Sequence, residues 1–596
     1  MINIPARITA LRAMMAAHKV DAYMIPTADP HQSEYVPDRW SHRYWISGFG
    51  GSAATVIVSG KHAGLWTDSR YFLQAEQELK GTGIELHKLK VQTQAEYVEW
   101  LCNHLQKGQT VGCDFWCFSY AQVRIFDKIF SEKGIILKDT GDLIDKIWED
   151  RPKINVDPVY DHPAKFAGSR REEKLKKLRA QLKLQKTDYL ILSALDEIAW
   201  LLNLRGSDVR CNPVFLAYLI VSKDTAVLFV PDHKIDAKLQ EKLTASGVSI
   251  RMYAEIEDAL RALPKNAVVQ FDPGGLNAKL SLTLAPDAMK EDVSPVMLMK
   301  SCKSTNEQNH IRKVMEKDGV ALIRAFIWLE KGLKKKKLIT EHDFAMQIAH
   351  FRSQQSHYVG ESFDAIVGYN SNGAIIHYKP HAENSARIKP KGILLIDSGG
   401  QYMDGTTDIT RTIALSKPGL EFKKQYTAVL MGHIALSDAV FPEGTKGIQL
   451  DALARQYLWK MGLNYGHGTG HGVGYFMNVH EPPQGFVSAW NQRGQTGMLE
   501  GMLTSNEPGF YKEGSYGIRI ENLVLNALHS KQGDLRFLKF ETVSLFPIDT
   551  HLIHMPIMNK QAVDWLNSYH KQVYKRLSPH LDASEKKWLK GKCREI

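Results

Sequence analysis

Five residues of the types that bind divalent metal ions recur along the last third of the chain. They lie in the segments IDSGGQYMDGTTDITRT, GHGTGHGVGYFMNVHEPP, SNEPGFY and GIRIENL, and they are Asp397, Asp408, His471, Glu507 and Glu521. Four carboxylates and one imidazole form an oxygen-rich donor set that suits Mn²⁺, Fe²⁺, Co²⁺ or Zn²⁺. Bridging carboxylates can hold two such cations about 3.5–4 Å apart, with a hydroxide shared between them. No cysteine occurs in these segments, which disfavours a structural zinc site.

The two aspartates are expected to lie close together in space. Asp397 follows the apolar run GILLI, and Asp408 follows the turn-forming sequence GTT eleven positions later. An odd separation on one continuous strand would place the two side chains on opposite faces. A glycine-rich hairpin instead reverses the chain and can bring both carboxylates to one side. An isolated pair of this kind is more commonly a turn and a cap, but three further ligand-type residues favour a metal site.

At these residues the chain resembles the pita-bread metallopeptidases, a family that includes methionine aminopeptidase, prolidase and aminopeptidase P. It is most similar to the long, three-domain, cytosolic form of aminopeptidase P, or Xaa-Pro aminopeptidase. The similarity also runs through YWISGFGGSAATVIV, GLWTDSRYF and LDEIAWLLNLRGSD, and therefore covers essentially the whole chain. The family's ligands are two aspartates eleven positions apart, one histidine and two glutamates, and the resemblance assigns these roles to the five residues above.

The resemblance also implies roles for three histidines. His377, in NGAIIHY, ends an apolar strand-like stretch and is expected to contact the substrate on the leaving-group side. His480, in NVHEPP, is expected to be a second active-site histidine, although its distance of nine positions from His471 is longer than in shorter family members. His467 lies among glycines that predict a loop. It is an alternative to His471 as metal ligand, but we assign it to the surrounding shell or to a proton relay.

Two further residues complete the predicted catalytic set. The resemblance implies that Glu507 is both a ligand and the carrier of a proton to the leaving nitrogen, and a ligand lies within the reach that this task needs. Arg519 stands two positions before Glu521, so on one strand it would face the same side and orient the carboxylates. A surface salt bridge is the alternative for Arg519. Arg70 and Asp208 lie in segments of strong similarity, but a strand-end salt bridge or a turn explains each equally well, so neither is predicted to be catalytic.

The implied activity is metal-dependent hydrolysis of the first peptide bond of peptides with proline in second position. The implied mechanism is attack by a hydroxide that bridges two divalent cations, with Mn²⁺ as the expected metal. Prolidase, which is restricted to dipeptides, is the nearest alternative, but it lacks one of the leading domains predicted below. Methionine aminopeptidase would need neither leading domain, and creatinase relatives without metal would lack several of the ligands. Non-catalytic pita-bread binding modules are a further alternative, and the intact ligand set argues against them.

The sequence pattern around these residues predicts the domains that position them. These are two similar α/β domains followed by a pita-bread domain with a helical carboxy-terminal extension. LRAMMAAHKVDAYMI (11–25) aligns without gaps to LRAQLKLQKTDYLIL (178–192), which indicates a diverged duplication. Each copy shows helical periodicity followed by an apolar strand. We predict domains at 1–157, 158–305 and 306–596, the last with an extension from about 540 to 596.

Local signals support these boundaries. Prolines and polar residues interrupt the pattern at 151–168, and Ser304 offers helix-capping chemistry before a long periodic helix. The tail AVDWLNSYHKQVYKRLSPHL is amphipathic and helical. The long-form family uses a comparable extension in dimer contacts, so a homodimer is expected, and a covering helix for its own domain is the alternative.

Composition excludes several classes of protein. A chain of 596 residues with 44% hydrophobic content is too long for one core. No segment approaches a transmembrane span, and the amino terminus reads as the start of a folded domain rather than a signal peptide. Six scattered cysteines form no metal-ligand or disulfide pattern, so reduced thiols and a cytoplasmic location are expected. Basic runs contribute to the net charge of +11 but contain no nucleic-acid motif, so we expect no nucleic acid and no membrane as partners. Peptide substrates are what the resemblance implies.

Overall fold

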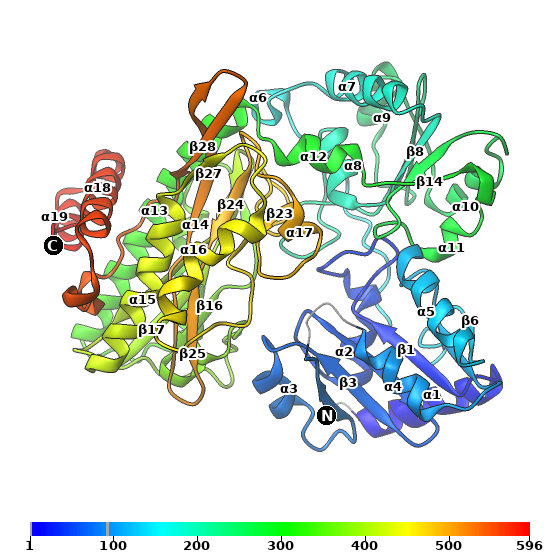
Figure 1. Ribbon diagram of the computed structural model, residues 1–596, viewed down its shortest axis with the longest axis horizontal. Coiled ribbons are helices and arrows are strands. Elements are labelled where there is room, and N and C mark those ends of the chain that lie inside the picture. Colours follow the sequence, from blue (N-terminus) through cyan, green and yellow to red (C-terminus); the bar gives the residue numbers. More distant parts are fainter. Residues whose placement is uncertain (1–2, 91–94) are drawn as a thin grey trace. The chain divides into compact units, whose positions relative to one another are not determined.

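The computed structural model describes residues 3–90 and 95–596, and the chain divides into two compact units. The first unit contains the chain up to Pro163 together with Ser169–Val296. The second contains Ala164–Gly168 and Met297–Ile596, and it carries all five predicted metal ligands. Figure 1 shows the helices and strands of each unit coloured along the sequence.

The first unit contains two six-stranded sheets of the same topology. The first has the order β4 (Glu85–Lys88), β3 (Ala63–Thr67), β2 (Ala54–Ser59), β1 (Ala22–Pro26), β5 (Thr110–Cys113), β6 (Ile136–Asp139). The second has the order β12 (Val248–Met252), β11 (Ala226–Val230), β10 (Tyr218–Ser222), β8 (Tyr189–Leu192), β13 (Val269–Phe271), β14 (Met289–Glu291). Each strand of the first sheet therefore has a counterpart at the same place in the second, which confirms the predicted duplication.

The helices of the first unit follow the sequence pattern. The two aligned segments form α1 with β1 and α7 with β8, as predicted. The helices of this unit are α1 (Ile4–Ala17), α2 (His42–Ser47), α3 (Phe72–Glu78), α4 (Glu96–His104), α5 (Tyr120–Glu132), α7 (Arg171–Leu184), α8 (Leu195–Leu201), α9 (Ala237–Ala245), α10 (Ile256–Arg261) and α11 (Ala278–Ser281). A further helix, α12 (Pro295–Ser301), leads into the second unit.

The second unit is the pita-bread domain, in which curved antiparallel sheets pack with long helices. Its helices are α6 (Ala164–Ala167), α13 (Thr305–Lys334), α14 (Glu341–Ser353), α15 (Leu420–Ser437), α16 (Gly447–Trp459), α17 (Gln492–Gln495), α18 (Lys560–Leu577) and α19 (Ala583–Lys592). Its three-stranded sheets are β15 (Tyr358–Glu361), β18 (Gly400–Tyr402), β19 (Gly405–Thr406) and β16 (Ile366–Tyr369), β17 (Ile393–Ser398), β20 (Ile409–Ala414). The largest sheet has the order β21 (Val440–Pro442), β28 (Leu535–Thr542), β27 (Asn522–Gln532), β24 (Leu503–Asn506), β22 (Gly470–Gly472), β23 (Glu481–Phe486), and a hairpin joins β25 (Gly509–Lys512) to β26 (Tyr516–Arg519).

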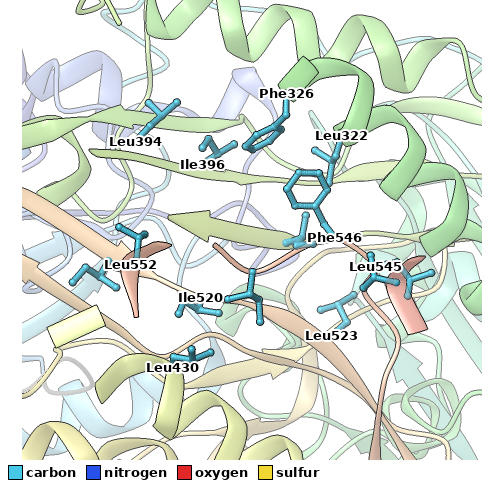
Figure 2. Packing of buried hydrophobic residues seen from close by; sticks show 14 of the residues in the cluster. Leu322, Phe326, Leu394, Ile396, Leu430, Ile520, Leu523, Leu545, Phe546 and Leu552 are labelled. Carbon is cyan, nitrogen blue, oxygen red and sulfur yellow. The ribbon is translucent and has the colours of Figure 1, made fainter. Parts of the chain in front are cut away.

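One hydrophobic core unites the helices and strands of this unit. Figure 2 shows Phe326 of α13 and Leu394 of β17 in the upper part of this core, and Ile520, between β26 and β27, with Leu430 of α15 in the lower part. All four side chains are buried in the same cluster. The strand residues of this core precede or adjoin the predicted ligands in the sequence, so packing fixes the backbone from which those ligands project.

Local capping and the carboxy-terminal helices follow the predictions. Ser304 is the N-cap of α13 and forms a capping box with Glu307. The tail forms α18, whose Leu566 and Val573 are buried in the core of the second unit together with Leu589 of α19. These helices therefore cover their own domain. None of the helices among the described residues is long and apolar enough to cross a membrane.

A buried ion pair ties two helices to the strand that ends near Asp397. Arg352 of α14 donates from Nε and Nη2 to the two carboxylate oxygens of Asp318 in α13, at 2.8 and 3.0 Å. Arg352 also donates to the carbonyl oxygen of Ser398, and the Tyr402 hydroxyl donates to Asp318. Both charged side chains are almost fully buried. Removal of one partner would leave the other as an uncompensated charge in a low-dielectric environment.

Arg352→Ala is therefore expected to lower the free energy of unfolding of the second unit by about 3–5 kcal/mol. The measurement is urea unfolding, followed by circular dichroism. Arg324→Ala is the matched control, because Arg324 pairs with Glu585 at a partly exposed position and such pairs contribute about 1 kcal/mol or less. Equal losses in the two variants would contradict the prediction.

Candidate metal centre

The two aspartates lie side by side because β17 pairs with β20. Asp397 is opposite Thr410 in this antiparallel pair, and Asp408 immediately precedes β20. The chain between them forms the β18–β19 hairpin. The structure thus confirms the predicted reversal of the chain. Residues 408 and 410 share a face by strand alternation, so Asp408 projects on the same side as Asp397.

His471 presents one ring nitrogen to the carboxylates. Its Nδ1 lies 3.0 Å from the carbonyl oxygen of Gly472, to which it donates, so Nε2 keeps its lone pair. This Nε2 is 3.4 Å from Glu507 Oε1 and 3.6 Å from Asp408 Oδ2. A second residue, Ser505, accepts a hydrogen bond from the His471 backbone N–H at 3.0 Å. The imidazole is thus fixed in the tautomer that a metal ligand needs.

The glycines around His471 are required by close backbone contacts. A Cβ at Gly470 would lie 1.8 Å from the Ser505 carbonyl oxygen, and a Cβ at Gly472 would lie 2.2 Å from that of Glu481. Strand β22 runs between β23 and β24, and these two positions allow its neighbours to approach closely. The glycines of the GHGTGHG sequence therefore allow the close strand packing that positions His471.

Glu507 and Glu521 lie opposite each other at an interruption of one antiparallel ladder. Asn506 pairs with Asn522 and Gly509 pairs with Arg519, so the same two segments pair in one register on both sides of this interruption. Pro508 lacks an N–H and cannot continue the ladder. The prediction that positions 519 and 521 lie on one strand was wrong for this reason. Thr410 donates to Glu521 Oε2 at 2.7 Å, which turns that carboxylate toward the aspartates.

Arg519 joins the carboxylate cluster to a second network. Its Nη2 donates to Asp397 Oδ2 at 2.6 Å, and its Nη1 donates to the Tyr511 hydroxyl at 2.7 Å. The Tyr511 hydroxyl lies 2.9 Å from Nε2 of His467, and the His467 Nδ1 lies 2.8 Å from the Gly468 carbonyl oxygen. Arg519 is buried, which excludes the surface salt bridge. His467 lies in a bend and contacts Tyr511, whereas His471 has its nitrogen beside the carboxylates.

The other two histidines have different surroundings. The His480 ring lies 4.3 Å from the His471 ring in an edge-to-face arrangement, so His480 borders the cluster. His377 does not end a strand, contrary to the sequence prediction. Strand β16 ends at Tyr369 and a short 3₁₀ turn, η4 (Asn370–Ala374), follows, because Glu341 accepts hydrogen bonds from the Tyr369 N–H and the Tyr378 hydroxyl.

His377 nevertheless lies in the turn that contacts Arg519. Its neighbour Ile376 accepts a hydrogen bond from Arg519 Nη2 at 3.4 Å. The guanidinium therefore links this turn to Asp397.

Sequence analysis did not identify His433, which contacts a residue adjacent to each of the two glutamates. Its Nδ1 lies 3.0 Å from the Asn506 carbonyl oxygen, and its Nε2 lies 3.1 Å from Asn522 Nδ2. Burial lowers the pKa of His433 to about 3, so the imidazole is neutral and donates to Asn506 while it accepts from Asn522. These asparagines adjoin Glu507 and Glu521 in the sequence. The only sequence signal was a histidine in an apolar helix, which is also typical of an ordinary core position.

Arg70 and Asp208 are held in ion pairs of the first unit. Arg70 binds Asp68 at 2.7 Å, and Lys234 Nζ lies 2.6 Å from Asp208 with both side chains fully buried. These contacts agree with the expectation that ion pairs or turns explain the two residues.

The electrostatics of the cluster fit a bound cation. Burial, together with repulsion from Glu521, raises the pKa of Asp408 and of Glu507 well above the usual values. Burial and the neighbouring Asp397 raise the pKa of Glu521 to about 8. Among the described residues, the buried Asp397 Oδ1 has no hydrogen-bond partner. Ligand atoms of Asp408, His471 and Glu521 lie within 4.8 Å of one another. A divalent cation would remove both the repulsion and the unsatisfied oxygen.

The chain matches four sequence families along its length. Residues 309–526 match metallopeptidase family M24, and residues 536–596 match the C-terminal region of peptidase M24. Residues 7–147 and 150–307 each match the creatinase/prolidase N-terminal domain.

Full-length relatives show the same relationship. The chain is 39% identical to Aminopeptidase P2 of Arabidopsis thaliana over 97% of this chain and 86% of that protein. It is 37% identical to Xaa-Pro aminopeptidase 1 of Dictyostelium discoideum over 100% of this chain and 97% of that protein. The chain belongs to the Xaa-Pro aminopeptidases of metallopeptidase family M24.

A solved structure extends this likeness to the whole fold. The X-prolyl aminopeptidase of Caenorhabditis elegans, described as a cytosolic enzyme with a di-nuclear active site, is 34% identical. It superposes with a TM-score of 0.96 and covers 100% of both chains. The chain is thus an enzyme of this hydrolase family, with two creatinase-type domains ahead of the M24 domain.

The raised pKa values predict how the metal-free M24 enzyme responds to pH. A folded-state pKa above the unfolded value means that the carboxyl groups favour folding when protonated, and that this contribution is lost as pH rises. Glu521 loses this contribution to stability as the pH rises from its ordinary pKa of 4.5 to its raised pKa of about 8. The Tm of EDTA-treated protein is therefore expected to fall between about pH 5 and pH 8.

Added Mn²⁺ is expected to remove most of this fall, because the cation replaces protons as the neutralising charge. The measurement is differential scanning calorimetry across that range, with and without Mn²⁺. Glu521→Gln is the control and should show a smaller fall without metal. An identical pH profile in the presence and absence of Mn²⁺ would count against a cation at this cluster.

Proposed function

We propose that this enzyme removes the first residue from peptides with proline in second position, by attack of a hydroxide that bridges two divalent cations. The observation that carries the proposal is the convergence of four carboxylates and one imidazole, namely Asp397, Asp408, His471, Glu507 and Glu521, in a member of the M24 family. When bound, the cations supply an activated nucleophile at neutral pH and polarise the scissile carbonyl.

The donor set supports Mn²⁺ as the metal. Carboxylate oxygens favour hard cations such as Mn²⁺, and a single imidazole is compatible with them. The related enzyme of C. elegans is described as having a di-nuclear active site. Four carboxylates carry four negative charges, which balance two divalent ions, and a hydroxide would offset the positive charge of Arg519 beside Asp397.

The residues around the ligands divide the remaining tasks. Glu507 is proposed to hold a proton at its carboxylate and to pass it to the leaving nitrogen. His480 borders the ligands and can donate a hydrogen bond to the developing oxyanion. His377 is proposed to contact the substrate on the leaving-group side. Arg519 positions Asp397 directly, and His467 acts through Tyr511 on the same guanidinium.

Proline in second position makes a special demand on such a site. The Xaa-Pro nitrogen carries no N–H and its ring fixes the backbone. A peptidase that grips that N–H cannot use the bond, so recognition must come from a pocket for the ring. A free amino terminus can bind a metal or a carboxylate, which would limit cleavage to the first bond.

The test uses metal-stripped enzyme and three substrates. A Xaa-Pro-Yaa tripeptide, a Xaa-Pro dipeptide and a Met-Ala-Yaa tripeptide are incubated with and without Mn²⁺, and mass spectrometry follows release of the first residue. Mn²⁺-dependent cleavage of the Xaa-Pro tripeptide supports the proposal. Preference for the dipeptide would indicate a prolidase, and no cleavage with several metals would indicate a binding module.

Three further proposals concern the whole chain. We propose domains at 1–157, 158–305 and 306–596, a homodimer in which the extension from about 540 contributes contacts, and a cytoplasmic location. The family matches at 7–147, 150–307 and 309–526 support this domain division. The scattered cysteines of the sequence and the cytosolic relative of C. elegans support the location. Sedimentation velocity of the full chain tests the dimer.

A further inference from the structure

A second group of metal-binding side chains lies in the first unit, far along the sequence from the M24 domain. It consists of His62, Glu85 and His87. His62 occupies the turn before β3, and the other two residues lie on β4. One possible ligand atom from each residue lies within 4.8 Å of the other two. None of these residues belongs to the proposed catalytic centre.

The sheet itself brings the three side chains to one face. Strands β3 and β4 are parallel, with Gly64 opposite Glu85 and Trp66 opposite His87. Side chains two positions apart along a strand share a face, so His62 falls in line with Gly64 and Trp66. Strand β4 is the edge of the sheet, which leaves the group open to solvent on one side.

The distance between the two imidazoles is the central observation. His62 Nε2 and His87 Nε2 lie 3.3 Å apart, the distance of a long hydrogen bond between the two rings. Two nitrogens bound tetrahedrally to zinc at about 2.0–2.1 Å are themselves about 3.3–3.4 Å apart. The Glu85 carboxylate oxygen is 3.7 Å from His62 Nδ1, and its side chain is 66% exposed and can rotate toward the pair.

The surroundings hold the imidazoles in this arrangement. A Cβ at Gly64 would lie 2.6 Å from His62 Nε2, so the glycine provides the space that this ring occupies. The His87 ring stacks on Trp66 at 3.9 Å, and the His62 ring lies 4.6 Å from Trp100 of α4. Figure 1 shows α4 beside β3. The two aromatic walls restrict both rings before any ligand arrives, which reduces the entropic cost of binding.

The duplicated domain provides an internal comparison. The bond from Ser59 N–H to the His62 carbonyl has its counterpart in the bond from Ser222 N–H to that of Thr225. Strand register then matches the remaining two positions, so the counterparts of His62, Glu85 and His87 are Thr225, Ser249 and Arg251. The second copy thus forms the same sheet without any of the three ligand types. The fold does not require them.

We infer that His62, Glu85 and His87 bind a single divalent transition-metal ion, with Zn²⁺ as the ion that best fits two imidazoles and one carboxylate. Zn²⁺ accepts these ligands and leaves a fourth position for water at the exposed side. Such an ion would tie the edge strand β4 to the turn before β3. This site is independent of the catalytic centre and of the proposed peptidase activity.

The test compares the zinc content of the full-length wild-type protein with that of a full-length variant. Wild type and His87→Ala are dialysed to equilibrium against the same zinc buffer at neutral pH, and bound zinc is measured by mass spectrometry. Wild type is expected to hold one zinc ion more per chain than the variant. Zinc in the catalytic centre cancels in this difference. Equal zinc contents would overturn the proposal.

Two further variants control for folding and for incidental histidine binding. Glu85 is largely exposed, so Glu85→Gln removes a ligand with little risk to the fold. It is expected to weaken zinc binding at least about tenfold, since even outer partners of a metal contribute that much. His233, an exposed histidine paired with Asp232, provides the control His233→Ala, which should retain the wild-type zinc content. An unchanged affinity in Glu85→Gln, or an equal loss of zinc in His233→Ala, would overturn the proposal.

Discussion

Asp408→Ala is expected to lower kcat/KM for a Xaa-Pro tripeptide by at least about a thousandfold. Asp408 is buried among three other carboxylates, and its Oδ2 lies 3.6 Å from the His471 ring nitrogen. Removal of this side chain takes away an oxygen that we propose as a metal ligand. The remaining groups then hold a cation less tightly, and the metal content of the purified protein is expected to fall as well.

A matched control lies four positions away in the same hairpin. Asp404 is also a buried aspartate, but it faces Lys317, with 2.7 Å between the ammonium nitrogen and the carboxylate. Asp404→Ala removes a carboxylate of the same kind from the same segment without touching the cluster. Its kcat/KM is expected to stay within about threefold of wild type at saturating Mn²⁺.

The comparison separates loss of metal from loss of folding. The circular dichroism spectra of both variants should resemble that of wild type. A large loss of activity in both variants would show that the hairpin, rather than Asp408 itself, is responsible. Wild-type activity in Asp408→Ala would remove this residue from the proposed ligand set.

The parts of the centre that could be predicted from sequence depend on local signals. The apolar run before Asp397, and the glycines and threonines before Asp408, mark a strand, a reversal and a second strand within a short stretch. The glycines around His471 similarly indicate a close backbone approach. Because these signals act over a few residues, they fix the placement of each ligand on its own element.

The errors arise where a distant residue decides the local backbone. His377 follows a run that reads as a strand, but Glu341 from α14 binds the Tyr369 N–H and ends β16 earlier. The ladder is interrupted between Arg519 and Asn522 because Pro508, on the opposite segment, cannot donate to it. No pattern within either segment carries that information, since it lies in residues that only the fold brings together.

The supporting residues were missed for the same reason. Tyr511 joins Arg519 to His467, and His433 joins the backbone beside Glu507 to the side chain beside Glu521. A tyrosine on a short strand and a histidine on an apolar helix have common structural explanations. Their role follows from contacts that span many residues in the sequence, and such contacts become visible only in three dimensions.

Glu507→Gln is expected to lower kcat by about 10²–10⁴-fold, the range that general acid–base catalysis contributes. The amide keeps an oxygen that can coordinate a cation, but it cannot accept a proton and later release it. Glu507 lies in the break of the sheet with its Oε1 3.4 Å from His471 Nε2. Burial and the nearby Glu521 raise its pKa, which suits a group that must hold a proton for part of the cycle.

Glu521→Gln is the variant that distinguishes a proton carrier from a ligand. Glu521 accepts a hydrogen bond from Thr410, and we propose it as a ligand rather than a carrier of protons. Its activity should recover substantially when the Mn²⁺ concentration is raised, because weaker binding is compensated by mass action. Activity of Glu507→Gln should not recover, since metal occupancy is not its main defect. Equal recovery in both variants would mean that Glu507 acts only as a ligand. Another group bordering the cluster would then have to carry the proton, and His480, whose ring contacts the His471 ring, is the candidate.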